Sequence, residues 1–355
     1  MRVWGAVLCA LPLALPALPA AAAPAYTVVR TVTLGGEGGW DYLSLAPKSG
    51  RLFIAHGTQV EVIDTRTLQP VGSVADTPGV HGIAPVEELG RGYISAGRAD
   101  AIVEFDLASL KRLKEIKSTG KNPDAIIYDP AARRVWAFNG HSNNATVIDT
   151  DKDEVTGTVA LSGKPEFAAS DGQGRVYVNI EDQGKIAVLD ARELRVIAEW
   201  PLPGCEEPSG LAINAAGGQL FSACSNRTLV ALDTHDGHVL GTAPIGAGVD
   251  AAAYDPQARL IFASCGEGVL SVLSQDASGA PRPAQAAVTA RGARTMALDA
   301  LRHRVYLVTA DFGPAPAASA EQPHPRPAPV AGSFKLLVLA PHPEQTTQDN
   351  PGKKP

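Results

Sequence analysis

A short pattern recurs along this chain at intervals of 41 to 43 residues, except for a last interval of 66, and it restricts the fold more than any other feature. The clearest copy runs from Gly120 to Thr150, with an apolar strand, an Asp-Pro turn, a second apolar strand, a loop and a third strand. The residue that closes the third strand is aspartate in five copies, and Ser274 and Ala340 take its place in the last two. The five aspartates are Asp64, Asp106, Asp149, Asp190 and Asp233. The pattern predicts an array of seven similar units.

Each unit has the content of a small antiparallel sheet. A turn rich in Asp, Gly or Pro precedes the second strand, and that strand contains an aromatic residue in every unit. The aromatic residues are Phe53, Tyr93, Trp136, Tyr177, Phe221, Phe262 and Tyr306. A fourth, more polar strand follows the closing position, as at 155–159. We therefore predict an all-β fold, a seven-bladed β-propeller of four-stranded blades.

The two ends of the array predict how the propeller closes. The seventh unit lacks a fourth strand after Ala340, whereas segment 26–34 is a strand without a partner in the first unit. We predict that this N-terminal strand completes the last blade, which leaves no open sheet edge at the seam. Residues 26–340 then form a single domain, and we expect the Pro-rich segment 341–355 to be a disordered tail.

Composition and the first residues bear on location and partners. The chain of 355 residues is 45% hydrophobic and has a net charge of −6, which argues against nucleic acid as a partner because that needs a basic surface. Residues 1–23 combine Arg2, an apolar run and a series of alanines, as in a secretory signal peptide. Prolines interrupt this run, and it is too short for a membrane span. We expect an exported, soluble and monomeric protein.

Several segments of the units also resemble a known family. They are 120–125 (GKNPDA), 147–150 (VIDT), 163–166 (GKPE) and 208–212 (PSGLA). The units resemble the YVTN-repeat β-propellers, and the chain as a whole is similar to YncE-like proteins over about residues 26–340. The resemblance implies the propeller fold and a bacterial periplasmic location, but it implies no particular activity. Some relatives bind DNA, and the acidic balance of this chain departs from that property.

One aligned position, at the entry to the first strand of each unit, is unusually rich in ionisable residues. Propeller topology places these seven positions, here called the ring, around the channel mouth on one face, here called the top face. The ring consists of Asp41, His81, Asp124, Glu166, Ser209, Asp250 and Thr295. Trp40, Glu206 and Arg294 lie beside ring residues in the sequence, so we add them to the candidate ligand site at the channel mouth.

Carboxylates that converge on one axis repel one another, so their charge must be offset. One solution is a bound divalent cation, for which the oxygens suit Ca²⁺ or Mg²⁺ and the imidazole admits Zn²⁺. The candidate metal ligands are Asp41, His81, Asp124, Glu166 and Asp250. A second solution is ion pairing that joins the blades, for which the neighbouring cations are Lys121, Lys164, Arg291 and Arg294. A third is a water-filled channel.

A second layer of polar residues follows the second strands. It consists of His56, Asn139, Asn179 and Glu181. These side chains are within reach of a pocket at the channel mouth, although a lone histidine is more often a hydrogen-bonded structural residue. Cys205 and Cys224 both lie near the top of the fifth unit, so we predict a disulfide between them in an oxidising compartment. The alternative pairs Cys224 with Cys265 as a metal site or a bridge between blades.

The seventh unit contains a Pro/Ala-rich insert at 311–333. Loops of this length in compact domains are usually functional or disordered. It is either a lid over the channel mouth, carrying Asp311, Phe312, His324 and Arg326, or a solvated excursion.

These features suggest a ligand- or partner-binding periplasmic propeller with a divalent cation (Ca²⁺, Mg²⁺ or Zn²⁺) at an acidic channel mouth. No nucleophile–base pair is recognisable, so an enzyme is the less favoured alternative, in the form of a metal-dependent lactonase or lyase. A further alternative is a protein-interaction scaffold that needs no ligand. The sequence specifies neither the small molecule nor the partner.

Overall fold

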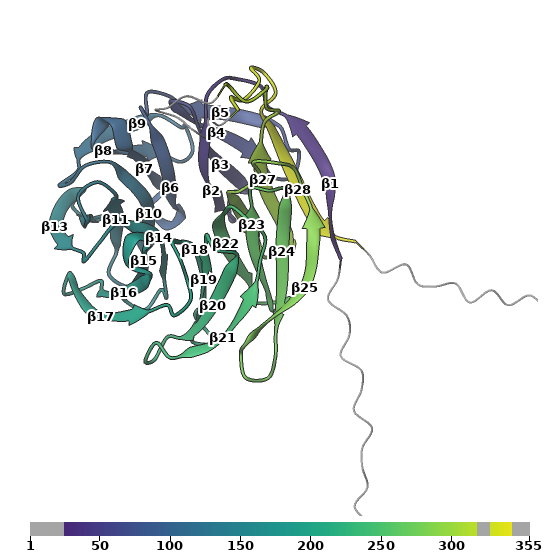
Figure 1. The fold of residues 1–355 in the computed structure, drawn as a ribbon. Coiled ribbons are helices and arrows are strands. Elements are labelled where there is room, and N and C mark those ends of the chain that lie inside the picture. The colour runs from purple at the N-terminus through teal and green to yellow at the C-terminus, as the bar shows by residue number, and fades with distance from the viewer. Residues whose placement is uncertain (1–24, 318–326, 343–355) are drawn as a thin grey trace, which may run out of the picture.

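The computed structural model describes residues 25–317 and 327–342, which form seven antiparallel sheets around a central axis (Figure 1). Each sheet contains four strands, so the predicted seven-bladed propeller is confirmed. The helices of the described residues are single 3₁₀ turns: η1 (Glu87–Leu89), η2 (Gly97–Ala99) and η3 (Glu181–Gln183). The predicted signal peptide at 1–23 and residues 343–355 of the predicted tail lie outside the described ranges.

Strands are numbered along the chain, and each of the first six blades runs outward from its innermost strand in sequence order. Blade one contains β2 (Trp40–Ala46), β3 (Arg51–His56), β4 (Gln59–Asp64) and β5 (Pro70–Val74). Blade two contains β6 (Val80–Val86), β7 (Arg91–Ala96), β8 (Ala101–Asp106) and β9 (Arg112–Lys117). Blade three contains β10 (Pro123–Asp129), β11 (Arg134–Asn139), β12 (Asn144–Asp149) and β13 (Glu154–Ala160).

The remaining blades continue this order around the axis. Blade four contains β14 (Pro165–Ser170), β15 (Arg175–Ile180), β16 (Lys185–Asp190) and β17 (Arg195–Pro201). Blade five contains β18 (Pro208–Asn214), β19 (Gln219–Cys224), β20 (Thr228–Asp233) and β21 (Val239–Pro244). Blade six contains β22 (Val249–Asp255), β23 (Leu260–Cys265), β24 (Val269–Gln275) and β25 (Pro281–Val288). Blade seven contains β26 (Met296–Asp299), β27 (Arg304–Thr309), β28 (Lys335–Pro341) and β1 (Tyr26–Thr33).

The N-terminal strand closes the propeller as predicted. β1 pairs antiparallel with β28, with Tyr26 opposite Pro341 and Thr33 opposite Lys335, and Figure 1 shows the two ends of the colour scale side by side. The backbone of Tyr26 also exchanges two hydrogen bonds with the amide side chain of Gln285 on β25, at 2.7 and 2.9 Å. Blade seven is thus built from both ends of the chain and is also tied to blade six.

The aromatic residues of the second strands form the centre of the packing between blades. All seven are at most 1% exposed, and the edge-to-face contact of Phe53 with Phe105 joins blade one to blade two. Burying a side chain of this size stabilises the fold by roughly 1.5–3 kcal/mol. This contribution explains why every unit of the repeat keeps an aromatic residue in its second strand.

The closing aspartate of the repeat shapes the turn between the third and fourth strands. The Asp64 carboxylate accepts hydrogen bonds from the backbone amides of Arg66 and Thr67, both at 2.9 Å. Asp190 accepts the equivalent pair from Arg192 and Glu193, both at 2.8 Å. Aspartate favours such turns because its short carboxylate reaches the amides two and three residues later. The recurring aspartate is therefore a structural residue and not part of the candidate site.

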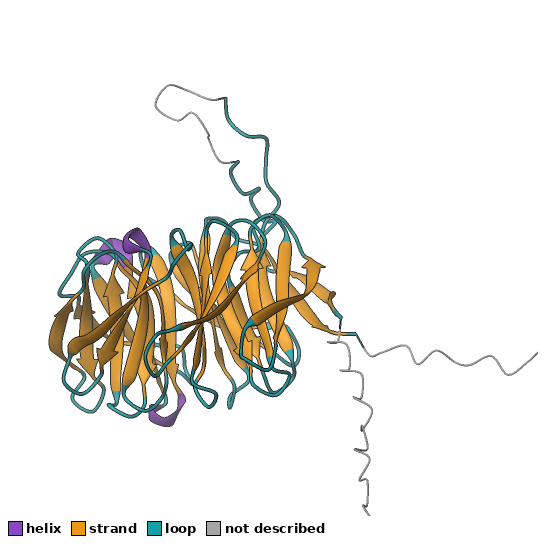
Figure 2. Ribbon diagram, turned by 60° about the horizontal axis from the view of Figure 1, so that its bottom comes forward, coloured by secondary structure: helices purple, strands orange, loops and turns teal. Residues whose placement is uncertain are grey.

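Figure 2 shows the disc from its side, with the insert of blade seven rising from one face. This is the top face, because the insert joins the end of β27 to the start of β28. The base of the insert is held by an isolated bridge between Phe312 and Pro329. His324 and Arg326, which a lid would carry, lie outside the described residues. Among the described residues, no helix has the length and apolar character needed to cross a membrane.

Candidate functional site

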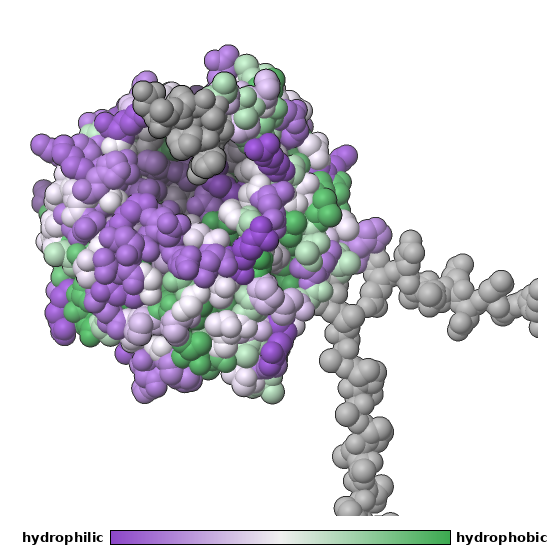
Figure 3. All heavy atoms as spheres, viewed as in Figure 1, coloured by the Kyte–Doolittle hydropathy of each residue, from purple (hydrophilic) through white to green (hydrophobic). Residues whose placement is uncertain are grey.

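The ring residues lie where the innermost strands are irregular. In six blades the pairing of the first and second strands changes register at the ring position, for example between Trp40 and Leu43 and between Val80 and Ile83. Such bulges redirect side chains away from the regular alternation of a strand. Asp41 and His81 line a cleft of about 680 Å³, and Figure 3 shows a hydrophilic hollow on this face.

Three ring residues from three consecutive blades meet at one point. Nδ1 of His81 lies 2.6 Å from Oδ2 of Asp41 and 3.6 Å from Oδ1 of Asp124. One ligand atom from each residue lies within 4.8 Å of the others, a separation that a single metal ion can span. The side chains are between 16% and 25% exposed, so the site is partly buried but still open to solvent. We call this group the Asp41–His81–Asp124 cluster.

A glycine on the neighbouring loop leaves room for the imidazole. A Cβ atom on Gly97 would lie 2.7 Å from Nε2 of His81 and 2.5 Å from Oδ1 of Asn122, too close for any larger residue. Asn122 has a left-handed backbone (φ 54°) and is held by a 2.9 Å bond from its amide to Asp100. The imidazole is therefore positioned on both sides. Asp41 holds Nδ1, and Gly97 and Asn122 lie beside Nε2.

The carboxylates of the cluster favour a charged imidazole. Burial alone disfavours the cation, but the hydrogen bond to Asp41 and the negative charges of Asp124 and Asp41 outweigh it. Together these effects raise the pKa of His81 to about 9. Without a bound cation, the imidazolium is thus the principal positive charge between the two carboxylates. A metal ion would have to displace its proton, so metal binding and protonation compete at this residue.

Two neighbouring acids of the ring are incompletely neutralised. Burial is the main cause that raises the pKa of Asp124 to about 6, against the opposing attraction of His81. Burial and repulsion from Asp124 raise the pKa of Glu166 to about 8. Both acids therefore hold protons far more readily than exposed carboxyl groups do.

The ion pair of Glu166 is consistent with that raised pKa. Nζ of Lys164 is 3.4 Å from Glu166, but the same ammonium forms a closer contact with Glu181. One cation is thus shared by two acids, and the more buried acid receives the weaker interaction. Glu181, predicted in the second layer, therefore acts on the ring through Lys164.

On the other side of the ring, Asp250 has a dedicated partner. Nε of Arg294 lies 2.6 Å from Oδ2 of Asp250, and the Ser209 hydroxyl donates to Oδ1 at 3.1 Å. Burial still raises the pKa of Asp250, although Arg294 opposes the shift. Arg294 also approaches the carbonyl oxygen of Trp40 at 3.5 Å, which links blades six, seven and one.

The structure therefore divides the five predicted metal ligands. Asp41, His81 and Asp124 come together, whereas Glu166 and Asp250 are engaged with Lys164 and Arg294. Only half of the predicted ion pairing forms. Lys164 and Arg294 contact ring acids, whereas the other two predicted cations do not. Lys121 binds Asp100, and the guanidinium of Arg291 lies 5.5 Å from the centre of the Phe312 ring.

Tyr42, which flanks Asp41 at the channel mouth, is a further residue of the site. Its ring packs on Phe167 at 5.1 Å, and burial together with the charges of Glu166, Asp124, Asp41 and Asp250 raises its pKa well above the usual range. It stays a neutral phenol among the ring carboxylates. The regular alternation of a strand would turn Tyr42 away from Asp41, and only the bulge at this point brings both to the ring.

Two further residues were predicted at the channel mouth. Trp40 lines the same cleft as Asp41 and His81, but it is only 7% exposed, and its ring packs on Phe312 and Phe334 with the ring centres 6.0 and 5.5 Å apart. Glu206 is exposed, and its hydrogen bonds run through its backbone to Asn226 and Ser225.

The predicted second layer is largely internal to the blades. Asn139 is buried and bonds to Ser118, Asn144 and Thr146 within blades two and three. Asn179 is also buried and donates to the carbonyl oxygen of the ring residue Ser209 at 2.9 Å. His56 lies off the ring against Phe334 and Glu61.

The predicted cysteine pair is present. Cys205 and Cys224 form a disulfide with their Cα atoms 5.4 Å apart, and Cys265 is a buried free thiol. A second group of potential metal ligands, Asp233, Asp236 and His238, occupies the turn after β20. This group is more exposed than the Asp41–His81–Asp124 cluster, and His238 binds Asp236 at 2.7 Å.

Comparison with known proteins identifies the fold and no family. The chain resembles the structure of U3-55K with a TM-score of 0.70 and 8% identity, over 88% of this chain and 98% of that one. It also matches a chain of hydrazine synthase from Kuenenia stuttgartiensis with a TM-score of 0.49 and 16% identity, over 64% of this chain and 93% of that one. No protein-family model and no curated protein sequence matches the chain.

Proposed function

We propose that this protein is an exported propeller that binds a divalent cation at the Asp41–His81–Asp124 cluster, and through it a ligand or partner on the top face. The observation that carries the proposal is the convergence of three ligand atoms from three blades within 4.8 Å. Two carboxylates and one imidazole form a mixed donor set, which suits Mn²⁺ or Zn²⁺ and is compatible with Ca²⁺.

The charge balance around the ring supports a cation. Three positively charged side chains form ion pairs with the carboxylates of this region, and they are His81, Lys164 and Arg294. Five carboxylates face them, and they are Asp41, Asp124, Glu166, Glu181 and Asp250. With His81 protonated, the full set carries two excess negative charges, which two bound protons would neutralise. A divalent ion that replaces the proton of His81 would leave one excess negative charge. The raised pKa values of Asp124 and Glu166 mean that bound protons offset the excess negative charge when no cation is present. A cation would displace those protons.

Metal analysis of the purified protein tests the proposal. We expect a divalent metal after purification without chelator, and we expect EDTA to lower the melting temperature and Mn²⁺, Zn²⁺ or Ca²⁺ to restore it. The Asp124→Asn variant should lose this response, whereas Asp236→Asn in the exposed turn after β20 should keep it. Equal responses of both variants, or none in the wild type, would reject the proposal.

An enzyme is the second candidate, and the raised pKa values of two ring acids favour it. General acid–base catalysis works best with groups whose pKa is near the working pH, and Asp124 at about 6 and Glu166 at about 8 meet this condition. A metal-dependent lactonase or lyase would use the cation to polarise an oxygen and one of these acids to move a proton. A panel of lactones and uronate-type lyase substrates, run with and without Mn²⁺, tests this candidate.

The disulfide supports export as part of the proposal. Cys205–Cys224 requires an oxidising compartment to form and persist, such as the bacterial periplasm. Membership of the YncE-like family, which the repeat segments suggest, is likewise a proposal. Fractionation of cells that express the full chain, with the N-terminus of the mature protein read by mass spectrometry, tests this location.

A further inference from the structure

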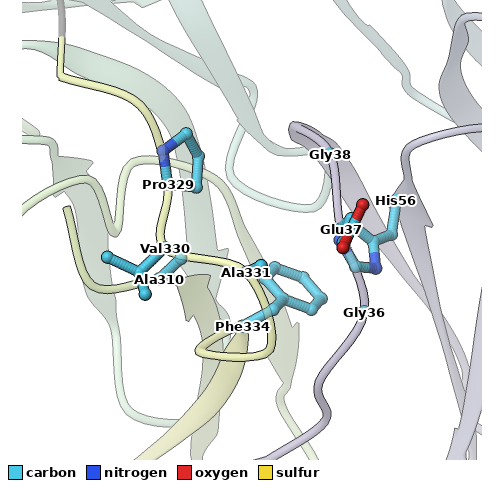
Figure 4. Close-up of a pocket in the computed structure, with 9 residues that line it drawn as sticks. All are labelled: Gly36, Glu37, Gly38, His56, Ala310, Pro329, Val330, Ala331 and Phe334. Carbon is cyan, nitrogen blue, oxygen red and sulfur yellow. The ribbon is translucent and has the colours of Figure 1, made fainter. Parts of the chain in front are cut away.

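A second cavity lies on the top face beside the propeller seam. It has a volume of about 250 Å³ and lies between the glycine-rich loop that follows β1 and the base of the insert (Figure 4). Hydrogen bonds from the amides of Leu34 and Gly35 to Phe334, and from Gly332 to Gly36, hold its walls together. It shares only Glu37 and Gly38 with the lining of the larger cleft, so it is a separate compartment.

A buried histidine with one unused nitrogen lines this cavity. His56 is 3% exposed, its ring stacks on Phe334 with the centres 3.9 Å apart, and Nδ1 lies 2.6 Å from Oε1 of Glu61. A carboxylate accepts hydrogen bonds, so Nδ1 is the donor, and the lone pair of the neutral ring is left on Nε2. Nε2 is buried and has no hydrogen-bond partner within residues 25–317 and 327–342. Such a group normally has a partner.

The rest of the lining defines what that partner can be. Glu37 adds an exposed carboxylate that forms no ion pair with any described residue. Phe334, Val330 and Pro329 supply apolar walls on the side of the insert, as Figure 4 shows. The cavity thus offers two acceptors, on His56 and Glu37, and an apolar surface formed by Pro329 and Val330. Glu37 repels anions, and two protein ligands are too few for a structural zinc site.

We propose that this cavity binds a small primary ammonium compound with an apolar body. The ammonium donates to Nε2 of His56 and to the Glu37 carboxylate, and the apolar body packs on Pro329 and Val330. The cavity is at the small end of ligand sites, which suits a molecule of the size of benzylamine. Gly36 lies directly against the imidazole, since an added Cβ would be 2.8 Å from Cε1 of His56, and its φ angle of 87° is a conformation that glycine adopts freely.

A comparison of benzylamine with benzyl alcohol tests the proposal directly. Both probes are titrated into EDTA-treated protein with its disulfide intact, so that the result does not depend on a cation at the Asp41–His81–Asp124 cluster. We expect benzylamine to bind about tenfold more tightly than the alcohol, because its donor is charged. We also expect Nε2 of His56 to shift in ¹⁵N-histidine NMR spectra as the amine is added.

Two charge-removing variants locate the site. Glu37→Gln, at an exposed position where folding is not at risk, should reduce benzylamine affinity about tenfold. Glu154→Gln removes the same charge from the exposed edge strand β13 and should leave the affinity unchanged. Equal binding of the two probes, no binding of benzylamine, an unmoved Nε2 signal, or equal effects of the two variants would each overturn the proposal.

Discussion

Nδ1 of His81 on blade two lies 2.6 Å from Oδ2 of Asp41 on blade one, and Oδ1 of Asp124 on blade three approaches the same nitrogen at 3.6 Å. Three blades therefore meet at one imidazole. Because the three residues occupy equivalent positions of the repeat, the propeller symmetry itself brings them together. The account of function depends on what this imidazole binds, a proton or a metal ion.

Removing the charge of Glu166 should stabilise the cation-free protein above neutral pH. Its pKa is raised from 4.5 to about 8 in the fold, so the folded state holds more protons than the unfolded state between these values. Its effect on stability therefore becomes less favourable as pH rises from about 4.5 to 8. Glu166→Gln should flatten this pH dependence and increase stability at pH 8.5 by roughly 1–3 kcal/mol. Urea unfolding with EDTA from pH 5 to 8.5 measures it, and a larger loss of stability with rising pH in the variant would contradict it.

Removing the partner of Asp250 should have the opposite effect. Arg294→Gln leaves a buried carboxylate with only the Ser209 hydroxyl, and because Arg294 is itself partly exposed we expect a moderate loss of about 1–3 kcal/mol. The double variant Asp250→Asn with Arg294→Gln should recover part of that loss. Thermal unfolding of the two single variants and the double variant gives the coupling energy, and strict additivity would show that the pair does not interact.

A methyl group at Gly97 should weaken cation binding by crowding His81. The added Cβ would lie 2.7 Å from Nε2 of His81, so the imidazole must move. We expect at least about tenfold weaker Mn²⁺ binding in Gly97→Ala, since a displacement of about an ångström disturbs the geometry of a site strongly. Gly140→Ala is the matched control at the equivalent position of blade three, because its Cβ would meet no atom closer than 3.7 Å. Similar Mn²⁺ affinities of the two variants would contradict the prediction.

Reduction of the disulfide should destabilise the protein without altering the ring. The bridge closes a segment of 19 residues in blade five, and cross-links over loops of this length contribute roughly 3 kcal/mol. The double variant Cys205→Ala with Cys224→Ala should therefore melt at a lower temperature but bind Mn²⁺ with unchanged affinity. Loss of Mn²⁺ binding in a variant that is still folded would show that blade five contributes to the site.

The fold could be predicted from the sequence because its determinants are local and repeated. The closing aspartates form turns through their own backbone amides, and aromatic residues such as Phe53 and Trp136 fill the same place in each blade. Closure by the N-terminal strand followed from counting strands.

The site was less predictable, because its geometry depends on contacts between blades. Equivalence within the repeat indicated that Asp41, His81 and Asp124 share a face, but it could not show that Arg294 would bind Asp250. The sequence places Tyr42 beside Asp41 at the channel mouth, but the residue pattern does not encode the bulge that brings both side chains to the ring. His56 was assigned to the second layer of the ring, whereas packing against Phe334 and Glu61 places it beside the seam.

Anomalous diffraction from crystals soaked in Mn²⁺ shows whether a metal ion binds at the Asp41–His81–Asp124 cluster. We expect one strong anomalous peak within bonding distance of Asp41, His81 and Asp124, and no such peak in crystals of Asp124→Asn. A map with no peak at this cluster, or with its main peak at the turn that holds Asp233, Asp236 and His238, would show that the cluster is not the metal site.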